Sequence, residues 1–222
     1  MFTDAYSPAA VCSPSRCSLL SGQYVPRHGH FLVNSQDAWL QRLESRGRWT
    51  ARLQPARWVE RLPLDRNTFG DCLQRGGYTT GFFGKWHIGE LYDETVPEQH
   101  PARRGFDEAI IHLMAGQYVK SPQERYFYPQ FSLSPEQDVP EGTYHGDLLT
   151  DQGVDFIERH AHDRFFLMLS YFLVHAPFQA KEETVSEYLQ KYPNVDRQHA
   201  TYLAMHKHLD EGVGRILATL EE

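Results

Sequence analysis

The side chains of this chain that could act as nucleophile, acid or base include three cysteines and twelve histidines. The first cysteine begins the segment Cys12-Ser13-Pro14-Ser15-Arg16, which continues into Leu19-Leu20-Ser21-Gly22. A cysteine beside a helix is more often a small buried residue than a nucleophile. A cysteine-phosphatase loop is excluded, because it needs the pattern C-x-x-x-x-x-R and here Arg16 follows Cys12 after only three residues.

The cysteine count excludes two other uses of these thiols. Cys12, Cys17 and Cys72 are too few, and odd in number, for a disulfide framework. Cys12 and Cys17 also have no second C-x-x-C or H-x-x-x-H pair that would complete a zinc site.

Two histidines and a lysine occur where a parallel sheet would present them. Residues 76–89 read as a strand that ends in a glycine-bounded turn with Lys85 and His87, which point the same way on an extended segment. His175 follows a second apolar run, in Val174-His175-Ala176-Pro177. Ligands of open α/β sheets bind at the carboxyl ends of the strands, where these residues would lie.

Together these segments resemble the formylglycine-dependent, arylsulfatase-like sulfatases of the alkaline-phosphatase-like superfamily. The matching patterns are C-x-P-S-R with its Leu-Leu-Ser-Gly tail, G-Y-x-T-x-x-x-G-K-W-H-x-G over residues 77–89, and the shorter H-x-P at His175. The resemblance covers nearly the whole chain. It implies that a formylglycine-generating enzyme reads the modification motif Cys12, Pro14, Ser15 and Arg16 in the unfolded chain and oxidises Cys12 to formylglycine.

The resemblance also assigns roles to five residues. The formylglycine hydrate from Cys12 attacks the sulfur of a sulfate ester, and Arg16 stabilises the ionised hydrate. Lys85 bridges the hydrate and a sulfate oxygen, and His87 hydrogen-bonds the hydroxyl that later drives sulfate elimination. His175 contacts the sulfate and helps to protonate the leaving alcohol. His28 and His30 are interpreted as structural supports of the Cys12 segment, and Arg104-Gly105-Phe106-Asp107 as scaffold.

A divalent ion, usually Ca²⁺, is a further implication of the resemblance. The family binds it with an Asp-Asp pair and an Asp-Asn pair, and neither pair occurs here, which leaves Cys12 as formylglycine the only expected ligand. We therefore interpret residues 1–222 as a partial sulfatase catalytic domain without the first metal-binding strand and the C-terminal part. The chain alone is expected to bind metal weakly and to turn over negligibly, whereas a full-length, periplasmic or secreted parent would be active.

Two other functions fit the same residues. The first is a phosphonate monoester or phosphodiester hydrolase of the same superfamily. The second is a degenerate, non-catalytic binding protein, which the joint presence of Cys12, Pro14, Arg16, Lys85, His87 and His175 disfavours. The expected partner is a sulfate-ester small molecule or a sulfated glycan. A net charge of −7 gives no support for nucleic-acid binding, and no apolar run is long enough to span a membrane.

An arginine-rich stretch over residues 35–61 allows two interpretations. Its cationic residues are Arg42, Arg46, Arg48, Arg52, Arg57 and Arg61. They could grip a polysulfated glycan, but a solvated helix without a charged partner is the favoured interpretation.

The elements expected to position these residues indicate one α/β domain. We predict a mostly parallel central sheet with helices on both faces, incomplete at both ends. A loop entering a short helix is expected over 8–22, a helix from Asn67-Thr68 to Gly76-Gly77, and a strand over 78–83. Residues 97–140 are predicted to be loop-rich and irregular. A helix from Asp147, a buried strand over 165–169 and an amphipathic helix through 202–220 complete the prediction.

Overall fold

The computed structural model describes residues 3–33, 35–45, 57–88, 97–114 and 125–222. It divides into two compact units, Met1–Gly76 with Trp86–Phe106 (unit 1) and Gly77–Lys85 with Asp107–Glu222 (unit 2). The prediction of a single domain stays a prediction. Among the described helices, none combines the length and the apolar character needed to cross a bilayer.

Unit 1 is built from short helices. They are α1 (Cys12–Ser21), α2 (Val25–His28), α3 (Gln36–Ser45) and α4 (Phe69–Arg75), followed by the 3₁₀ turns η1 (Pro97–Gln99) and η2 (Pro101–Arg103). The predicted short helix is confirmed as α1, which ends where Gly22 takes a left-handed φ of 65°. The arginine-rich stretch contributes α3, whereas Arg46, Arg48 and Arg52 lie outside the described residues.

The predicted helix after Asn67-Thr68 is confirmed as α4, and its start is a capping box. The Thr68 hydroxyl accepts from the backbone N–H of Asp71 at 3.2 Å, and the Asp71 carboxylate accepts from the N–H of Thr68 at 2.6 Å. Gly105 packs so closely on α4 that a Cβ there would lie 1.9 Å from the Asp71 nitrogen. The Arg104 guanidinium donates to the carbonyl oxygen of Arg66 at 2.9 Å. These contacts give Arg104 and Gly105 the structural role that was predicted for them.

Two buried histidines hold α1 in place. His30 Nδ1 lies 2.8 Å from the carbonyl oxygen of Val59, which can only accept, so Nδ1 carries the hydrogen. His30 Nε2 therefore accepts from the Ser13 hydroxyl at 2.6 Å. His28 Nδ1 accepts from the backbone N–H of His30 at 3.1 Å, which leaves His28 Nε2–H to donate to Ser18 at 2.9 Å. Burial lowers the pKa of both imidazoles, which favours these neutral forms. Their predicted structural role agrees with these contacts.

Unit 2 contains the sheet, whose order is β3-β2-β1-β4. The strands are β1 (Thr79–Gly84), β2 (Glu108–Leu113), β3 (Ser132–Ser134) and β4 (Phe165–Ser170). β1 pairs in parallel with β2 and with β4, and β2 pairs antiparallel with β3. The predicted α/β class with a mostly parallel sheet is therefore confirmed. The interpretation of residues 97–140 as irregular is wrong where β2 and β3 lie.

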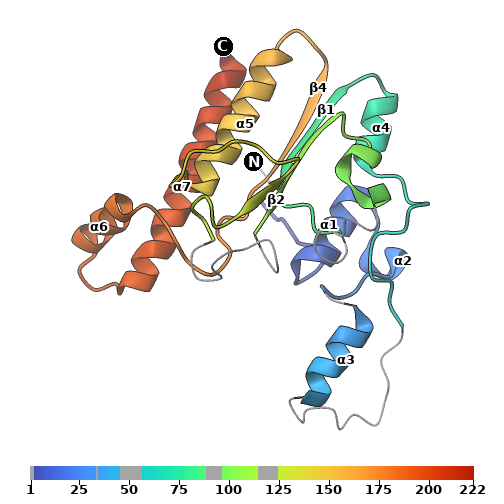
Figure 1. Ribbon diagram of the computed structural model, residues 1–222, viewed down its shortest axis with the longest axis horizontal. Coiled ribbons are helices and arrows are strands. Elements are labelled where there is room, and N and C mark those ends of the chain that lie inside the picture. Colours follow the sequence, from blue (N-terminus) through green and yellow to red (C-terminus); the bar gives the residue numbers. More distant parts are fainter. Residues whose placement is uncertain (1–2, 34, 46–56, 89–96, 115–124) are drawn as a thin grey trace. The chain divides into compact units, whose positions relative to one another are not determined.

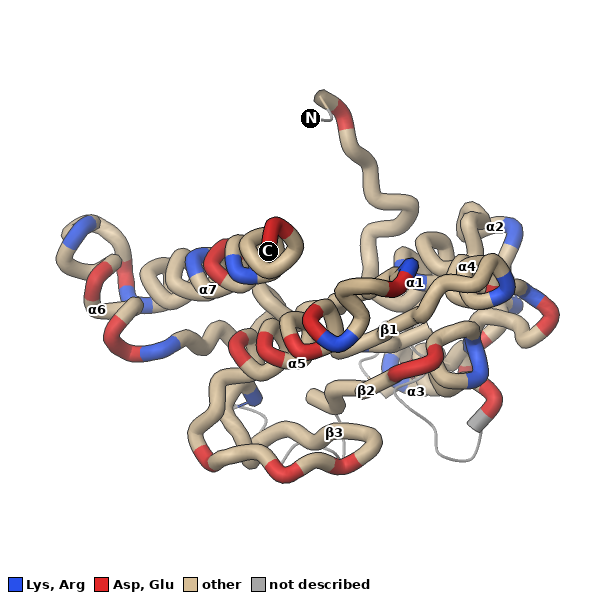
Figure 2. The backbone as a smooth tube through the Cα atoms, turned by 90° about the horizontal axis from the view of Figure 1, so that it is seen from above, with Lys and Arg blue, Asp and Glu red and all other residues tan. Residues whose placement is uncertain are grey.

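Helices α5 (His145–Arg159), α6 (Glu182–Lys191) and α7 (Arg197–Glu221) complete unit 2. α5 contacts β1 and β4, α7 lies beside α5, and α6 packs on α7 (Figure 1). Charges of both signs follow α5 and α7 (Figure 2), and Arg215 of α7 forms an ion pair with Asp151 of α5 at 2.6 Å. The helix predicted from Asp147 is confirmed as α5, and the amphipathic helix as α7, which begins five residues before Tyr202.

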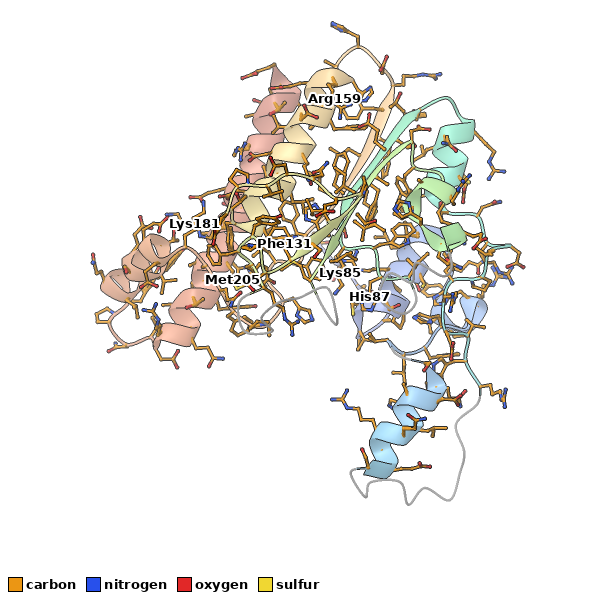
Figure 3. The ribbon with its side chains drawn as sticks, in the orientation of Figure 1. Lys85, His87, Phe131, Arg159, Lys181 and Met205 are labelled. Carbon is orange, nitrogen blue, oxygen red and sulfur yellow. The ribbon has the colours of Figure 1, made fainter. Side chains whose placement is uncertain are left out.

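Apolar clusters hold unit 2 together, and one of them, Val185 with Ala200 and Ala204, joins α6 to α7. Phe83, Leu149 and Phe156 join β1 to α5. A further cluster includes Phe131 and Met205, which are labelled in Figure 3. β4 is less buried than predicted, because its residues from Phe165 to Leu169 are all half-buried. Among the described residues β4 pairs with β1 alone, so one edge of this apolar strand has no neighbour there.

A chain of polar side chains crosses the core of unit 2. His112 Nε2 lies 2.8 Å from Oε1 of Gln152, whose amide nitrogen donates to Gln137, so His112 Nε2 donates its hydrogen. His145 Nε2–H then donates to His112 Nδ1 at 2.9 Å. Burial lowers the pKa of His112 to about 4 and that of His145 well below its usual value. Both rings are therefore neutral at neutral pH.

We expect His30→Ala to lower the free energy of unfolding by about 2–4 kcal/mol. The variant removes the hydrogen-bond partner of buried Ser13 and leaves a cavity. Urea denaturation followed by tryptophan fluorescence measures this change. The matched control is His199→Ala at an exposed position of α7, where the change should stay within about 0.5 kcal/mol. A His30→Ala variant as stable as this control would contradict the structural role.

The His112–His145 pair should make unit 2 sensitive to acid. Both folded pKa values lie below the value of about 6.5 in the unfolded chain, so the unfolded chain takes up more protons as the pH falls from about 6.5 towards 4. Stability is lost over this range, and His145→Gln should make the unfolding free energy less dependent on pH there. Urea denaturation at several pH values provides the test, with exposed His162→Gln as the control. An unchanged slope in His145→Gln would refute the prediction.

Candidate functional site

Cys12 is the first residue of α1 and is half-buried. Val11 before it is extended and caps the helix without a side-chain hydrogen bond. Pro14 is tolerated in this first turn, because its missing N–H would have no intrahelical acceptor. The positive end of the helix dipole lies at Cys12, where it favours a negatively charged group.

Arg16 lies one turn after Cys12, so the two side chains share a helix face. Burial lowers the pKa of the Arg16 guanidinium, and its electrostatic interaction with Cys12 works in the opposite direction. The guanidinium stays protonated at any accessible pH. A fixed positive charge therefore accompanies Cys12 at the end of the helix.

The other two cysteines have different surroundings. Cys17 is fully buried, its Sγ donates to the carbonyl oxygen of Ile88 at 3.4 Å, and burial raises its pKa to about 12. Such a thiol is a structural residue, since the thiolate is the reactive form. Cys72 is exposed on α4, a helix that carries none of the predicted site residues.

His87 belongs to unit 1 and is the one non-glycine residue with a positive φ, 53°, among the described residues. Both of its neighbours are anchored. The Trp86 indole N–H donates to the carbonyl oxygen of Gln99 at 2.6 Å, and the Ile88 carbonyl accepts from Leu62 at 2.8 Å. A non-glycine residue in this conformation is strained and persists where its surroundings enforce it. Because Ile88 also accepts from Cys17, the segment that carries His87 is bonded to α1.

Lys85 follows β1 in unit 2 and is buried. Its backbone N–H donates to the carbonyl oxygen of Ser170 at 2.8 Å, and its carbonyl accepts from the Ser170 hydroxyl at 2.7 Å. Its ammonium nitrogen lies 5.0 Å from the centre of the Phe172 ring, within range of a cation–π interaction (Figure 3 labels Lys85). Only glycine fits at Gly84, since a Cβ there would lie 2.3 Å from the carbonyl oxygen of Ser170.

His175 lies on the exposed loop after β4, also in unit 2. Its Nδ1 donates to the carbonyl oxygen of Ala176 at 2.6 Å, which makes Nε2 the proton-accepting nitrogen of the neutral ring. The loop is fixed by Tyr126, whose hydroxyl lies 2.7 Å from the carbonyl oxygen of His175 and 3.1 Å from that of Phe172. Lys85 and His175 thus follow two adjacent parallel strands at their shared carboxyl edge.

The predicted site residues fall into two groups. Cys12, Arg16 and His87 lie in unit 1, and Lys85 and His175 lie in unit 2. Sequence reasoning missed Ser170 and Tyr126, which hold the second group. Ser170 was visible only as the polar end of an apolar run, and Tyr126 lies in a stretch without periodicity.

Comparison with known proteins gives consistent matches. A family model described as Sulfatase matches residues 1–222. The chain is 27% identical over 237 residues to mouse (Mus musculus) N-acetylgalactosamine-6-sulfatase, covering 100% of this chain and 40% of that protein. It is 30% identical over 160 residues to human (Homo sapiens) arylsulfatase G, covering 71% of this chain and 25% of that protein.

A solved structure agrees with these sequences. The crystal structure of Ps i-CgsB in complex with k-i-k-neocarrahexaose is 26% identical to this chain, with a TM-score of 0.72 over 99% of this chain and 46% of that one. The chain therefore spans about 40% of the length of its N-acetylgalactosamine-6-sulfatase relative. A family match over the whole chain and a shared fold lead to one conclusion: the chain belongs to the sulfatase family.

Proposed function

We propose that the complete protein containing this chain is a sulfuric ester hydrolase whose nucleophile is a formylglycine hydrate made from Cys12. One observation carries the proposal. The C-x-P-S-R motif of this sulfatase-family chain forms the first turn of α1, with Cys12 at the positive end of the helix and Arg16 one turn away. This is an environment that stabilises a developing negative charge on an oxygen attached at position 12.

The proposed reaction uses both hydroxyls of the hydrate. One hydroxyl oxygen attacks the sulfur of the substrate, and the bond from sulfur to the alcohol oxygen breaks. The second hydroxyl then loses its proton, the carbon regains its double bond to oxygen, and sulfate leaves. Arg16 stabilises the ionised hydrate, and His87 takes the proton of the second hydroxyl.

Two residues of unit 2 complete the proposed set. The Lys85 ammonium binds a sulfate oxygen and neutralises charge that develops there. The exposed ring of His175, protonated on Nε2, donates its proton to the departing alcohol. The proposal requires all five side chains to act on one sulfate group.

The proposed substrate is a sulfated carbohydrate rather than a simple aryl sulfate. N-acetylgalactosamine-6-sulfatase relatives carry a sugar sulfate in their name, and the related Ps i-CgsB structure holds an oligosaccharide. A formylglycine-generating enzyme would be the partner that modifies Cys12.

A metal ion is implied by the family, but the described residues do not fit one. In the part of the chain that the structure describes, no group of three or more His, Cys, Asp or Glu side chains could hold a metal ion. No step of the proposed mechanism is therefore routed through Ca²⁺, which we assign to the complete protein.

Oxidation of Cys12 should be visible in its mass and in activity. After co-expression with a formylglycine-generating enzyme, the tryptic peptide that contains Cys12 should weigh about 18 Da less than its cysteine form. In the complete protein, Cys12→Ala should lower hydrolysis of nitrophenyl sulfate on the order of 10⁴-fold or more, since the nucleophile is lost.

Cys72→Ala is the matched control for this experiment, because Cys72 is exposed on α4 and should leave turnover unchanged. Full turnover by Cys12→Ala would refute the proposed mechanism. Faster hydrolysis of phenyl phosphonate esters than of nitrophenyl sulfate would instead favour a phosphonate or phosphodiester hydrolase.

Calcium should bind this chain weakly or not at all. The expectation follows from the ligand sets of the described residues, which supply too few oxygen donors for a Ca²⁺ site. Isothermal titration calorimetry of the 222-residue chain with CaCl₂ measures the affinity directly. Micromolar binding would show that residues of this chain form a complete site.

A further inference from the structure

Unit 2 contains a cleft lined by residues of the loop after β4, of α6 and α7, and of the segment 127–142. Its volume is about 560 Å³, which is within the usual range for small-molecule sites. The residues that line this aromatic cleft include Phe127, Tyr128, Phe178, Glu141, Glu182 and Arg197.

Each of the three aromatic rings of the cleft is held by contact with another aromatic ring. Each packs on a second ring, with distances between centroids of 5.1 Å for Phe127 on Tyr144, 5.7 Å for Tyr128 on Phe131 and 5.1 Å for Phe178 on Tyr202. Rings that are held in this way lose little conformational freedom when a ligand binds, which favours affinity.

The backbone of the cleft wall is also fixed. The N–H of Tyr128 donates to the carbonyl oxygen of Thr143 at 3.0 Å, and the N–H of Gly142 donates to the carbonyl oxygen of Tyr128 at 2.8 Å. An antiparallel bridge joins Phe127 to Tyr144. The aromatic wall is therefore preformed, as ligand sites usually are.

The charges of the cleft disfavour an anionic occupant. Glu182 and Arg197 form an ion pair with each other, whereas Glu141 is exposed at the cleft and adds a negative charge. A sulfated ring would meet this carboxylate at close range, where like charges repel. An uncharged ring with apolar faces and hydroxyl edges fits a site made of aromatic rings, amides and carboxylates.

The cleft lies close to His175 along the chain. Phe178 follows His175 by three residues, which limits the distance between their Cα atoms to about 11 Å. Tyr126 ties both parts of the loop, since its hydroxyl bonds the His175 carbonyl and its backbone N–H donates to Oε1 of Gln179 at 3.0 Å. A short oligosaccharide can therefore contact His175 and the aromatic cleft at the same time.

We propose that the aromatic cleft binds an uncharged sugar ring that neighbours the sulfated ring of an oligosaccharide substrate. This inference rests on the proposed function, and it adds a preference: the ring in the cleft carries no sulfate. The aromatic faces of Phe127, Tyr128 and Phe178 receive the apolar face of the sugar, and Glu141 accepts hydrogen bonds from its hydroxyls.

Turnover of two substrates by the complete protein tests the proposal. Tyr128→Ala should lower kcat/KM about tenfold for an oligosaccharide with one sulfated ring flanked by unsulfated rings, and should leave nitrophenyl sulfate hydrolysis unchanged. Phe178→Ala serves as a second variant with the same expectation. Tyr192→Ala, an exposed tyrosine outside the cleft lining, is the matched control and should change neither value. Equal effects on both substrates, or no effect on either, would overturn the proposal.

Binding of an unsulfated oligosaccharide separates this inference from the proposed function. A neutral galactan hexasaccharide should bind the complete protein, measured by NMR titration, and Tyr128→Ala should weaken its Kd about tenfold whether or not the protein hydrolyses sulfate esters. Glu141→Gln should improve kcat/KM for an oligosaccharide that is sulfated on the flanking ring. No binding of the neutral hexasaccharide at millimolar concentration, or an unchanged Kd in Tyr128→Ala, would overturn the cleft assignment alone.

Discussion

The buried hydrogen bonds that position α1 are the constraint on which the rest of unit 1 depends. Ser13 and Ser18 lie on the buried side of the helix, where the hydroxyl of Ser13 is hydrogen-bonded to His30 and that of Ser18 to His28. Each imidazole has its second nitrogen committed, His30 to the Val59 carbonyl and His28 to a backbone N–H, so neither ring can turn without breaking a buried bond. Unmade hydrogen bonds in the interior cost more than made ones contribute. The helix is therefore fixed in rotation as well as in position, and with it the face that carries Cys12 and Arg16.

In unit 2, hydrogen bonds between adjacent strands hold Lys85 in position. The backbone of Lys85 makes two hydrogen bonds to Ser170, one with its carbonyl oxygen and one with its hydroxyl. Gly84, the residue before Lys85, allows β1 and β4 to approach each other closely at this point. The loop that follows β4 is irregular, and aromatic hydroxyls take the place of a ladder there. Tyr126 bonds the carbonyls of Phe172 and His175, and Tyr144 bonds that of Gln179 at 2.9 Å. Rigid strands and a braced loop together present an ammonium and an imidazole at one edge of the sheet.

Most elements whose bounds are set by residues close together in the sequence were predicted from that sequence. The end of α1 follows from Gly22 and the start of α4 from the Thr68 capping box. β1 follows from a segment rich in aromatic and threonine residues, and β4 from an apolar run of strand length. β2 was missed because apolar and polar residues do not alternate in Glu108–Leu113, and because its buried His112 is satisfied only by distant residues, His145 and Gln152. The site residues were predicted from motif spacing, whereas Ser170 and Tyr126 could not be, because their roles depend on contacts between segments 46 to 85 residues apart. Contacts at such separation leave no local pattern.

The burial of the first turn of α1 determines when the proposed modification of Cys12 can occur relative to folding. Ser13 and Pro14 are buried in the folded chain, Arg16 is half-buried, and Cys17 lies in the interior. A second protein that reads Cys12, Pro14 and Arg16 as a short extended peptide would find only part of that peptide on the folded surface. The proposed conversion of Cys12 must then come before α1 docks on His28 and His30, so maturation and folding are competing processes. Under the proposed function, a chain that folds first would keep its thiol, and faster folding would yield more folded protein without the formylglycine nucleophile.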